Sequence, residues 1–386
     1  MQRFSPDPRS LAPNPWTPSF SLAEREAALL APYAMPSRTT RGRPYAEPPH
    51  AYRGPFQRDR DRIIHSAAYR RLSGKTQVFT GEPGDYHRTR LTHTIEVASI
   101  ARTIGRALRL NEDLIEALAL LHDIGHPPFG HAGEDTLDAA LASEGGFDHN
   151  RHALRIVEHL EYRYPGFAGL NLSVEVLEGQ AFRDGKDASQ VRPLVEVQVV
   201  DAADSIAYDA HDADDALELG LLRLDELAEV ALWREAVARV RRRFVDLAES
   251  ELRRAVVHEL IDYRVDDLLR ETTARIGRFG VDSPAAVRLA PWLAATGDEA
   301  AAKKADLEAF LYDRVYRHPR VMDVRRAAQA KLAEMFAAYE RRPDLLPEGF
   351  RRRADEVGLR RTIGDYLAGM TDRFALAQYD RLANGN

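Results

Sequence analysis

The spacing of its apolar residues is the feature that most constrains how this chain folds. From Arg58 onward, apolar residues recur every three or four positions, as at Leu91 and Ile95. This period places them on one face of an α-helix. Residues 194–200 favour a strand locally, but they lead directly into the helical spacing of 201–217. We therefore predict an all-α fold.

Other segments lack this spacing. Residues 179–193 and 277–305 are polar and contain glycine, so we expect loops there within the helical body. Residues 75–86 leave room for a small hairpin. The sequence shows no internal repeat and no clean domain boundary. We divide the chain into an N-terminal arm at 1–55 and a single body at 56–386, with a core at about 58–220 and a further helical part at about 221–386.

Proline content defines the arm. Eleven of the 21 prolines fall within the first 55 residues, a density that a helix cannot hold. One short helix is expected near its middle, because Ser21 and Glu24 have the spacing of a capping box. The arm is thus Pro-rich but not wholly irregular.

Composition excludes several classes of site. The chain has no cysteine, which rules out disulfides, Cys-ligated zinc, iron–sulfur clusters and thiol catalysis. A net charge of -6 does not favour a protein that coats DNA, although arginines are dense at 38–43, 53–71 and 351–361. We find neither a membrane-spanning apolar run nor a signal peptide, and therefore expect a cytoplasmic protein. Any metal must be bound through nitrogen and oxygen.

Histidines cluster in one part of the sequence. Seven of the 13 lie between residues 87 and 152. The pair His122-Asp123 closes an apolar helix at 114–121, so both side chains can turn toward one ion. His93 lies near the start of the preceding helix, which a short connection at Asn111 would pack antiparallel to the first. Two histidines and a carboxylate can therefore converge.

The helix beginning near Asp201 supplies further carboxylates. Asp204, Tyr208 and Asp212 stand at positions i, i+4 and i+8, so they share one helix face. This stripe has the form of a site wall, and the alternative is a solvated acidic face with Tyr208 as packing. We predict that His93, His122, Asp123 and Asp204 bind one divalent ion. This ligand set suits Mn²⁺ or Mg²⁺ best, accommodates Fe²⁺ or Co²⁺, and favours zinc less.

The same residues carry a family resemblance. His93, His122-Asp123 and Asp204 resemble the H...HD...D signature of HD-domain phosphohydrolases. Four surrounding segments resemble the dGTP triphosphohydrolase branch of that superfamily: YRRLSGKTQVF at 69–79, RTRLTH at 88–93, HDIGHPPFGHAGE at 122–134 and DYLAGMTDRF at 365–374. The resemblance spans roughly residues 56–382. It implies an HD-type helical fold with additional C-terminal helices, and cleavage of deoxynucleoside triphosphates (dNTPs) at the α-phosphate to a deoxynucleoside and tripolyphosphate, a reaction that controls dNTP pools.

Catalytic roles follow from the spacing and the resemblance together. His131 and Glu134 lie three residues apart, which would let the carboxylate orient the imidazole if the segment is helical. We predict that this pair transfers protons. His126 and His149 match positions that contact phosphates or assist proton transfer in relatives. The alternative for both is a structural role.

Substrate contacts are also implied. Arg90 matches an α-phosphate contact, while Arg70, Arg71 and Lys75 are weaker phosphate candidates. Gln77 and Asp212 match residues that hydrogen-bond the 3′ hydroxyl, and Tyr208 matches one that packs on the sugar. A tight wall there would exclude a 2′ hydroxyl. Tyr366 is a further candidate for that wall.

One position departs from the family pattern. Ser205 stands where some dNTPases of the superfamily have a lysine directly after the last metal aspartate, which leaves one phosphate contact unaccounted for.

Relatives also assemble into hexamers or tetramers whose interfaces bind single-stranded DNA or a second dNTP. We therefore expect a homo-oligomer with such an allosteric ligand. Two alternatives stay open: an HD-domain enzyme acting on another nucleotide phosphoester, and a nucleotide-sensing or nucleic-acid-binding regulator.

Overall fold

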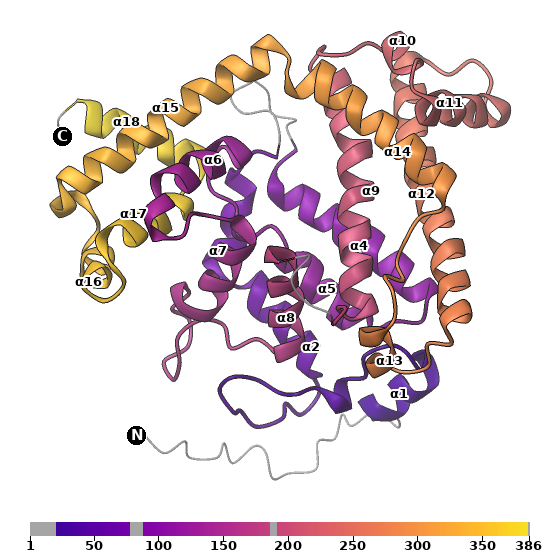
Figure 1. Cartoon of the computed structure of the whole chain (residues 1–386), viewed down its shortest axis with the longest axis horizontal. Coiled ribbons are helices and arrows are strands. Elements are labelled where there is room, and N and C mark those ends of the chain that lie inside the picture. Colours follow the sequence, from indigo (N-terminus) through magenta and orange to yellow (C-terminus); the bar gives the residue numbers. More distant parts are fainter. Residues whose placement is uncertain (1–20, 78–87, 186–190, 385–386) are drawn as a thin grey trace.

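The computed structural model describes residues 21–77, 88–185 and 191–384, and helices dominate these segments (Figure 1). The α-helices are α1 (Leu22–Leu29), α2 (Pro55–Ile64), α3 (Ala67–Arg71), α4 (Arg90–Ala107), α5 (Glu112–Leu121), α6 (Gly130–Ala140), α7 (His149–Arg155), α8 (Val174–Asp184), α9 (Val195–Glu218), α10 (Leu224–Leu227), α11 (Ala231–Arg243), α12 (Glu249–Phe279), α13 (Pro284–Leu289), α14 (Asp298–Leu311), α15 (Pro319–Arg341), α16 (Glu348–Val357), α17 (Leu359–Ala368) and α18 (Asp372–Ala383). Short helical turns occur at η2 (Ser37–Thr39), η3 (Leu72–Gly74), η4 (Ala142–Glu144), η5 (Ile156–Leu160), η6 (Tyr312–Tyr316) and η7 (Pro343–Leu345). The predicted all-α fold is confirmed.

Strand pairing within these segments is limited to two isolated bridges, Thr76 with Thr89 and Tyr162 with Gly169. Most of the predicted hairpin at 75–86 lies outside the described residues. None of the described helices combines the length and the apolar character needed to cross a membrane.

Three clusters of buried apolar side chains form the core. The first joins α2, α4, α5 and α9 near the centre of the molecule and includes Ile63, Ile115 and Val199. The second joins the end of α9 to α11, α12 and α14 around Trp233. The third packs α6 against α15, α17 and α18 around Leu332. α15 runs from the end of α14 to α6, so α15, α17 and α18 pack on the α6 side of the molecule (Figure 1).

Of the predicted arm at 1–55, only residues 21–55 can be compared with the structure, because residues 1–20 lie outside the described part. The predicted capping box is confirmed: Ser21 and Glu24 bond reciprocally at the start of α1. Farther along, Met35 is buried in the first cluster. The Arg43 guanidinium bonds the buried Asp59 carboxylate. The end of the arm is therefore packed against the body.

Both loop predictions are wrong in part. α8 continues to Asp184, and residues 277–305 contain the end of α12, all of α13 and the start of α14. Gly179 suggested a break but serves packing: a Cβ there would lie 2.5 Å from Leu118 Cδ2 and 2.9 Å from Val197 Cγ2. The missing side chain therefore lets α8 lie directly against α5 and α9.

Candidate active site

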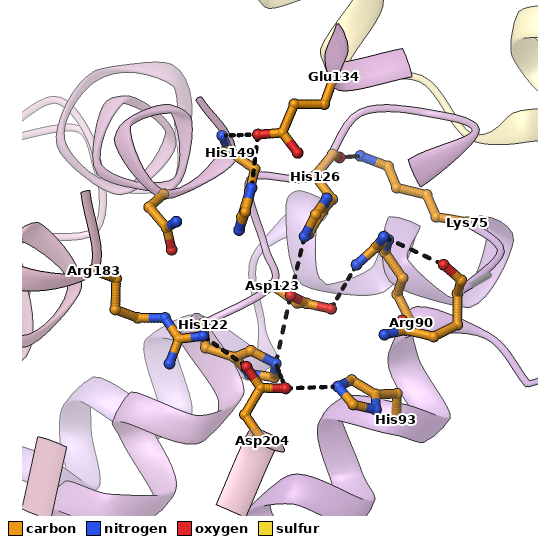
Figure 2. Close-up of polar contacts among 12 residues, drawn as sticks. Lys75, Arg90, His93, His122, Asp123, His126, Glu134, His149, Arg183 and Asp204 are labelled. Carbon is orange, nitrogen blue, oxygen red and sulfur yellow. Dashed lines mark hydrogen bonds and ion pairs between the residues drawn. The ribbon is translucent and has the colours of Figure 1, made fainter. Parts of the chain in front are cut away.

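Four side chains from three helices converge beside α9 (Figure 2). His93 comes from the first turn of α4, His122 caps the end of α5 and Asp123 follows it. Asp204 comes from the middle of α9. Its Oδ1 lies 3.1 Å from His93 Nε2 and 3.7 Å from His122 Nε2. His122 Nε2 is also 3.5 Å from Asp123 Oδ1. His93, His122 and Asp204 therefore converge, and Asp123 adjoins this group through His122 and also belongs to a second group with His126 and His149.

The donors fit a divalent cation. His122 Nδ1 donates to the Ala119 carbonyl at 2.6 Å. A carbonyl can only accept, so the proton is on Nδ1 and Nε2 presents a lone pair. That Nε2 atom is buried and has no hydrogen-bond partner within the described residues. His93, His122 and Asp204 can hold a metal ion, because their ligand atoms all lie within 4.8 Å of one another.

Each carboxylate divides its two oxygens between the histidines and an arginine. Asp123 directs Oδ1 toward His122 and accepts from Arg90 Nη1 at 2.7 Å on Oδ2. Asp204 directs Oδ1 toward His93 and accepts from Arg183 Nη2 at 2.7 Å on Oδ2. Arg90 and Arg183 thus lie on opposite sides of the cluster (Figure 2).

These contacts keep both carboxyls ionised. Burial by itself would raise the pKa of Asp204, but His122, the hydrogen bond with His93 and the Arg183 guanidinium hold it well below its ordinary value. Burial opposes ionisation of Asp123 in the same way, and His122 and Arg90 hold its pKa well below the usual range. Both groups are anions at neutral pH.

A second group of histidines adjoins the first. The rings of His126 and His149 stack with centroids 3.8 Å apart, and His126 Nε2 lies 3.3 Å from Asp123 Oδ1. Gly125 makes this possible, since a Cβ there would lie 2.0 Å from the His149 carbonyl oxygen. Burial holds the pKa of His126 well below its ordinary value, so its ring is neutral.

Glu134 serves a different histidine from the one predicted. The segment is helical as expected, but Oε1 of Glu134 accepts from the backbone N of His149 at 2.9 Å and pairs with its Nδ1 at 2.8 Å. The cause is geometric, because the start of α7 presents two nitrogens to one carboxylate oxygen. His131 instead lines a neighbouring cavity.

That cavity has a volume of about 390 Å³ and an aromatic wall. Its lining includes Gln77, Phe129, His131, Tyr208, Tyr312, Tyr316, Arg320 and Arg325. Gln77 is buried and its Oε1 has no hydrogen-bond partner among the described residues. The Tyr316 hydroxyl donates to Asp212, and burial raises the pKa of that carboxyl to about 7. Gln77 and Tyr208, predicted as substrate contacts, thus share one cavity, and Asp212 lies behind it.

Comparison with known proteins decides the family. A model of the HD domain matches residues 90–209, and a model of the phosphohydrolase-associated domain matches residues 294–381. Deoxyguanosinetriphosphate triphosphohydrolase-like proteins are similar over most of their length. The protein from Geobacter metallireducens is 42% identical over 369 residues, which covers 93% of this chain and 96% of the relative. Those from Bradyrhizobium sp. and Bordetella pertussis are 45% and 44% identical over 92% of this chain and 97% and 96% of the relatives.

The chain belongs to the dGTP triphosphohydrolase branch of the HD-domain phosphohydrolases. It is accordingly a metal-dependent phosphohydrolase of the HD type, with additional C-terminal helices. The HD match ends in α9, so both Asp204 and the residues up to Asp209 fall within it. Tyr316 lies within the second match, and it reaches across to Asp212.

The other predicted contacts of this HD-domain enzyme are dispersed. Lys75 is buried, and its Nζ donates to the carbonyls of His126 and Ala368. Arg71 bonds the Gly369 carbonyl, and Arg70 bonds the His65 carbonyl. Tyr366 packs against Tyr339 and Phe350 in the third core cluster.

Two site residues were missed by sequence reasoning. Arg183 was assigned to a loop, yet it ends a helix and contacts Asp204. Tyr316 is 104 residues from its partner Asp212. The one local signal was that Arg183 is a basic residue where a helix could end, a position at which such side chains are favourable. Nothing local to Tyr316 indicated its contact.

Proposed function

We propose that this chain hydrolyses dNTPs at the α-phosphate and releases a deoxynucleoside and tripolyphosphate. The observation that carries the proposal is the adjacency of two features. The His–Asp cluster lies beside a small aromatic cavity: Arg90 bonds both Asp123 and the Gln77 carbonyl, and the His126 ring adjoins both Asp123 and His131. The names of the relatives point to dGTP as a substrate of that group of proteins. A phosphate at the cluster and a deoxyribose in the cavity would fit this arrangement.

His93, His122, Asp123 and Asp204 would hold the ion, with Mn²⁺ or Mg²⁺ as the preferred species and Fe²⁺ or Co²⁺ as further possibilities. When bound, a divalent ion supplies Lewis acidity that polarises a phosphoryl oxygen and lowers the pKa of water. The chain contributes the orientation of the ligands. The Ala119 carbonyl fixes the His122 ring, and Arg90 and Arg183 fix the two carboxylates.

Histidines would move the protons. His126 is neutral, and its Nδ1, which has no hydrogen-bond partner within the described part of the chain, can accept a proton or a hydrogen bond. His149 is oriented by Glu134, so its ring presents Nε2. His131, on the cavity wall, would serve either the attacking water or the departing 5′ oxygen. In this scheme Glu134 is a positioning residue that acts through His149.

The sugar would lie in the cavity. Gln77 Oε1 is a buried acceptor without a partner among the described residues, which a 3′ hydroxyl would satisfy. Asp212 would be the second contact to that hydroxyl, next to Tyr316. Tyr208 and Tyr316, whose ring centroids are 6.1 Å apart, would pack on the sugar face and exclude a 2′ hydroxyl.

A substrate panel tests the proposal. All dNTPs and NTPs are incubated with Mn²⁺ or Mg²⁺, and the products are resolved by ion-exchange chromatography. We expect deoxynucleoside and tripolyphosphate from dNTPs, and turnover of NTPs that is slower by about tenfold or more. Orthophosphate or pyrophosphate as the primary product would favour another phosphoester. Absence of turnover with every divalent ion would favour a nucleotide sensor.

A further inference from the structure

The geometry points to Arg183 as a second phosphate-binding cation of this site, opposite Arg90. This inference rests on the proposed function for the identity of the substrate, but not for the contacts that carry it. Arg183 closes α8, and Gly179 lets that helix pack against α9 so closely that the arginine reaches Asp204. Figure 2 shows its guanidinium beside the Asp204 carboxylate.

Arg90 and Arg183 are arranged symmetrically about the His–Asp cluster. Arg90 donates to the outer oxygen of Asp123 at 2.7 Å, and Arg183 donates to the outer oxygen of Asp204 at the same distance. The inner oxygens of both carboxylates face histidine nitrogens. Each arginine therefore leaves the ligand oxygen of its carboxylate unobstructed. An ion can be bound without displacing either guanidinium.

The positive charges of the buried Arg90 and Arg183 side chains also favour an anionic ligand. Arg90 and Arg183 expose 1% and 12% of their side chains, and a buried cation is costly unless anions surround it. Asp201 Oδ1, 3.4 Å from Arg183 Nη1, offsets part of this charge. A bound divalent ion would offset the negative charges of Asp123 and Asp204. The positive charges of Arg90 and Arg183 would then be available to bind a phosphate. A triphosphate carries about four negative charges, and arginine forks match its oxygens.

Arg183 has an N–H donor that its contacts with the described residues do not use. A guanidinium has five N–H groups. Arg183 uses Nη2 for Asp204 and Nη1 approaches Asp201, whereas its buried Nε has no hydrogen-bond partner among the described residues. A buried donor without an acceptor is unfavourable, and a phosphate oxygen would satisfy it.

This assignment also accounts for the departure at Ser205. That residue directly follows Asp204, at the position where the family resemblance led us to expect a lysine. Arg183 brings a cation to the same aspartate from a neighbouring helix. We therefore infer that the missing phosphate contact is supplied by α8 rather than by α9.

The test measures binding of inorganic tripolyphosphate to the Mn²⁺-loaded protein by calorimetry, independently of turnover. We expect Arg183→Gln to weaken binding about tenfold or more, and Arg183→Lys to recover part of the loss because it keeps the charge but not the fork. Arg288→Gln is the matched control, since Arg288 also pairs with α8, through Glu178, away from the cluster. It should bind like the wild type.

Folding of each variant is checked by its melting temperature and by the rise that Mn²⁺ produces. If Arg183→Gln does not fold, Arg183→Lys carries the test. Equal tripolyphosphate affinity in wild type and Arg183 variants, or no binding by the wild type, would overturn the inference. If dNTP turnover is absent but tripolyphosphate binding depends on Arg183, the inference stands and the proposed reaction fails. Normal turnover together with binding that does not depend on Arg183 would support the proposed reaction and overturn the inference.

Discussion

Asp204 and Asp212 lie on one face of α9, two helical turns apart, yet their carboxyls behave in opposite ways. The pKa of Asp204 lies well below its ordinary value, because His122, His93 and Arg183 outweigh burial. The pKa of Asp212 is raised to about 7, because burial is opposed by little more than the Tyr316 hydroxyl. The sequence spacing is regular, but the environments are not.

This difference separates two tasks along one helix. An obligate anion surrounded by imidazoles suits a cation. A carboxyl that is largely neutral below pH 7 can both donate and accept, which suits a hydroxyl group. Under the proposed function, the helix would therefore span the boundary between a metal end of the site, at Asp204, and a sugar end, at Asp212. Variants at each end can show whether the two are separable.

The largest effect is expected at the metal end. Asp204→Asn removes a charged ligand, so we expect kcat/KM for dNTPs with Mn²⁺ to fall at least about 10³-fold, equivalent to several kcal/mol. Asp225→Asn, an exposed aspartate on α10, is the control and should retain full activity. More than about a tenth of wild-type activity in Asp204→Asn would show that the carboxylate is not a ligand.

A third carboxyl sharpens the comparison, because in the proposed function Glu134 orients His149 and neither binds the ion nor contacts the sugar. Glu134→Gln weakens the orientation of His149, and steady-state kinetics should show kcat lowered about 10²-fold with KM nearly unchanged. Mn²⁺ affinity should not change. Glu144→Gln on the nearby η4 turn serves as the control. A loss of Mn²⁺ binding in Glu134→Gln would assign Glu134 to the metal end instead.

The raised pKa of Asp212 has a consequence for stability. The folded value of about 7 exceeds the unfolded value of about 3.9, so the folded state binds the extra proton between them. This contribution is fully present below the unfolded pKa and is lost as pH rises through 7. Between about pH 5 and 8, the free energy of unfolding should fall by roughly 2 kcal/mol more in the wild type than in Asp212→Asn. Urea denaturation at both pH values measures the difference, and parallel curves would contradict it.

The smallest effect is expected on substrate affinity at the sugar end. Under the proposed function, Asp212→Ala would remove a hydrogen bond to the 3′ hydroxyl, and we therefore expect KM for dNTPs to rise about tenfold while kcat changes little. The control is a 2′,3′-dideoxynucleoside triphosphate, which lacks that hydroxyl, so its KM should be nearly the same in wild type and variant. A fall in kcat without a change in KM would place Asp212 in the chemistry.

Local sequence was sufficient to predict that the residues of the His–Asp cluster lie close together. His122 and Asp123 are adjacent at the end of an apolar helix, and the helical period fixes the faces of α4 and α9, so their convergence follows from packing one apolar face on another. The surroundings of Asp212 were harder to predict from the sequence. Tyr316 reaches Asp212 across 104 residues, through the docking of α14 on α9 that no local pattern encodes.

Arg183 and Glu134 show a different limit. Gly179 suggested a loop because glycine commonly breaks helices, whereas here its missing side chain admits Leu118 and Val197. Glu134 was paired with the nearest histidine along its helix. The actual partner, His149, arrives from another helix that Gly125 allows to approach. In both cases we predicted a structure from neighbouring residues in the sequence, whereas packing between helices determines it.

Calorimetric titration of Mn²⁺ into three proteins tests the division of α9 most directly: wild type, Asp204→Asn and Asp212→Asn. We expect one site in the wild type, no measurable site in Asp204→Asn and a wild-type isotherm in Asp212→Asn. Retained Mn²⁺ binding by Asp204→Asn, or its loss in Asp212→Asn, would contradict the assignment of the two carboxyls to different ends of the site.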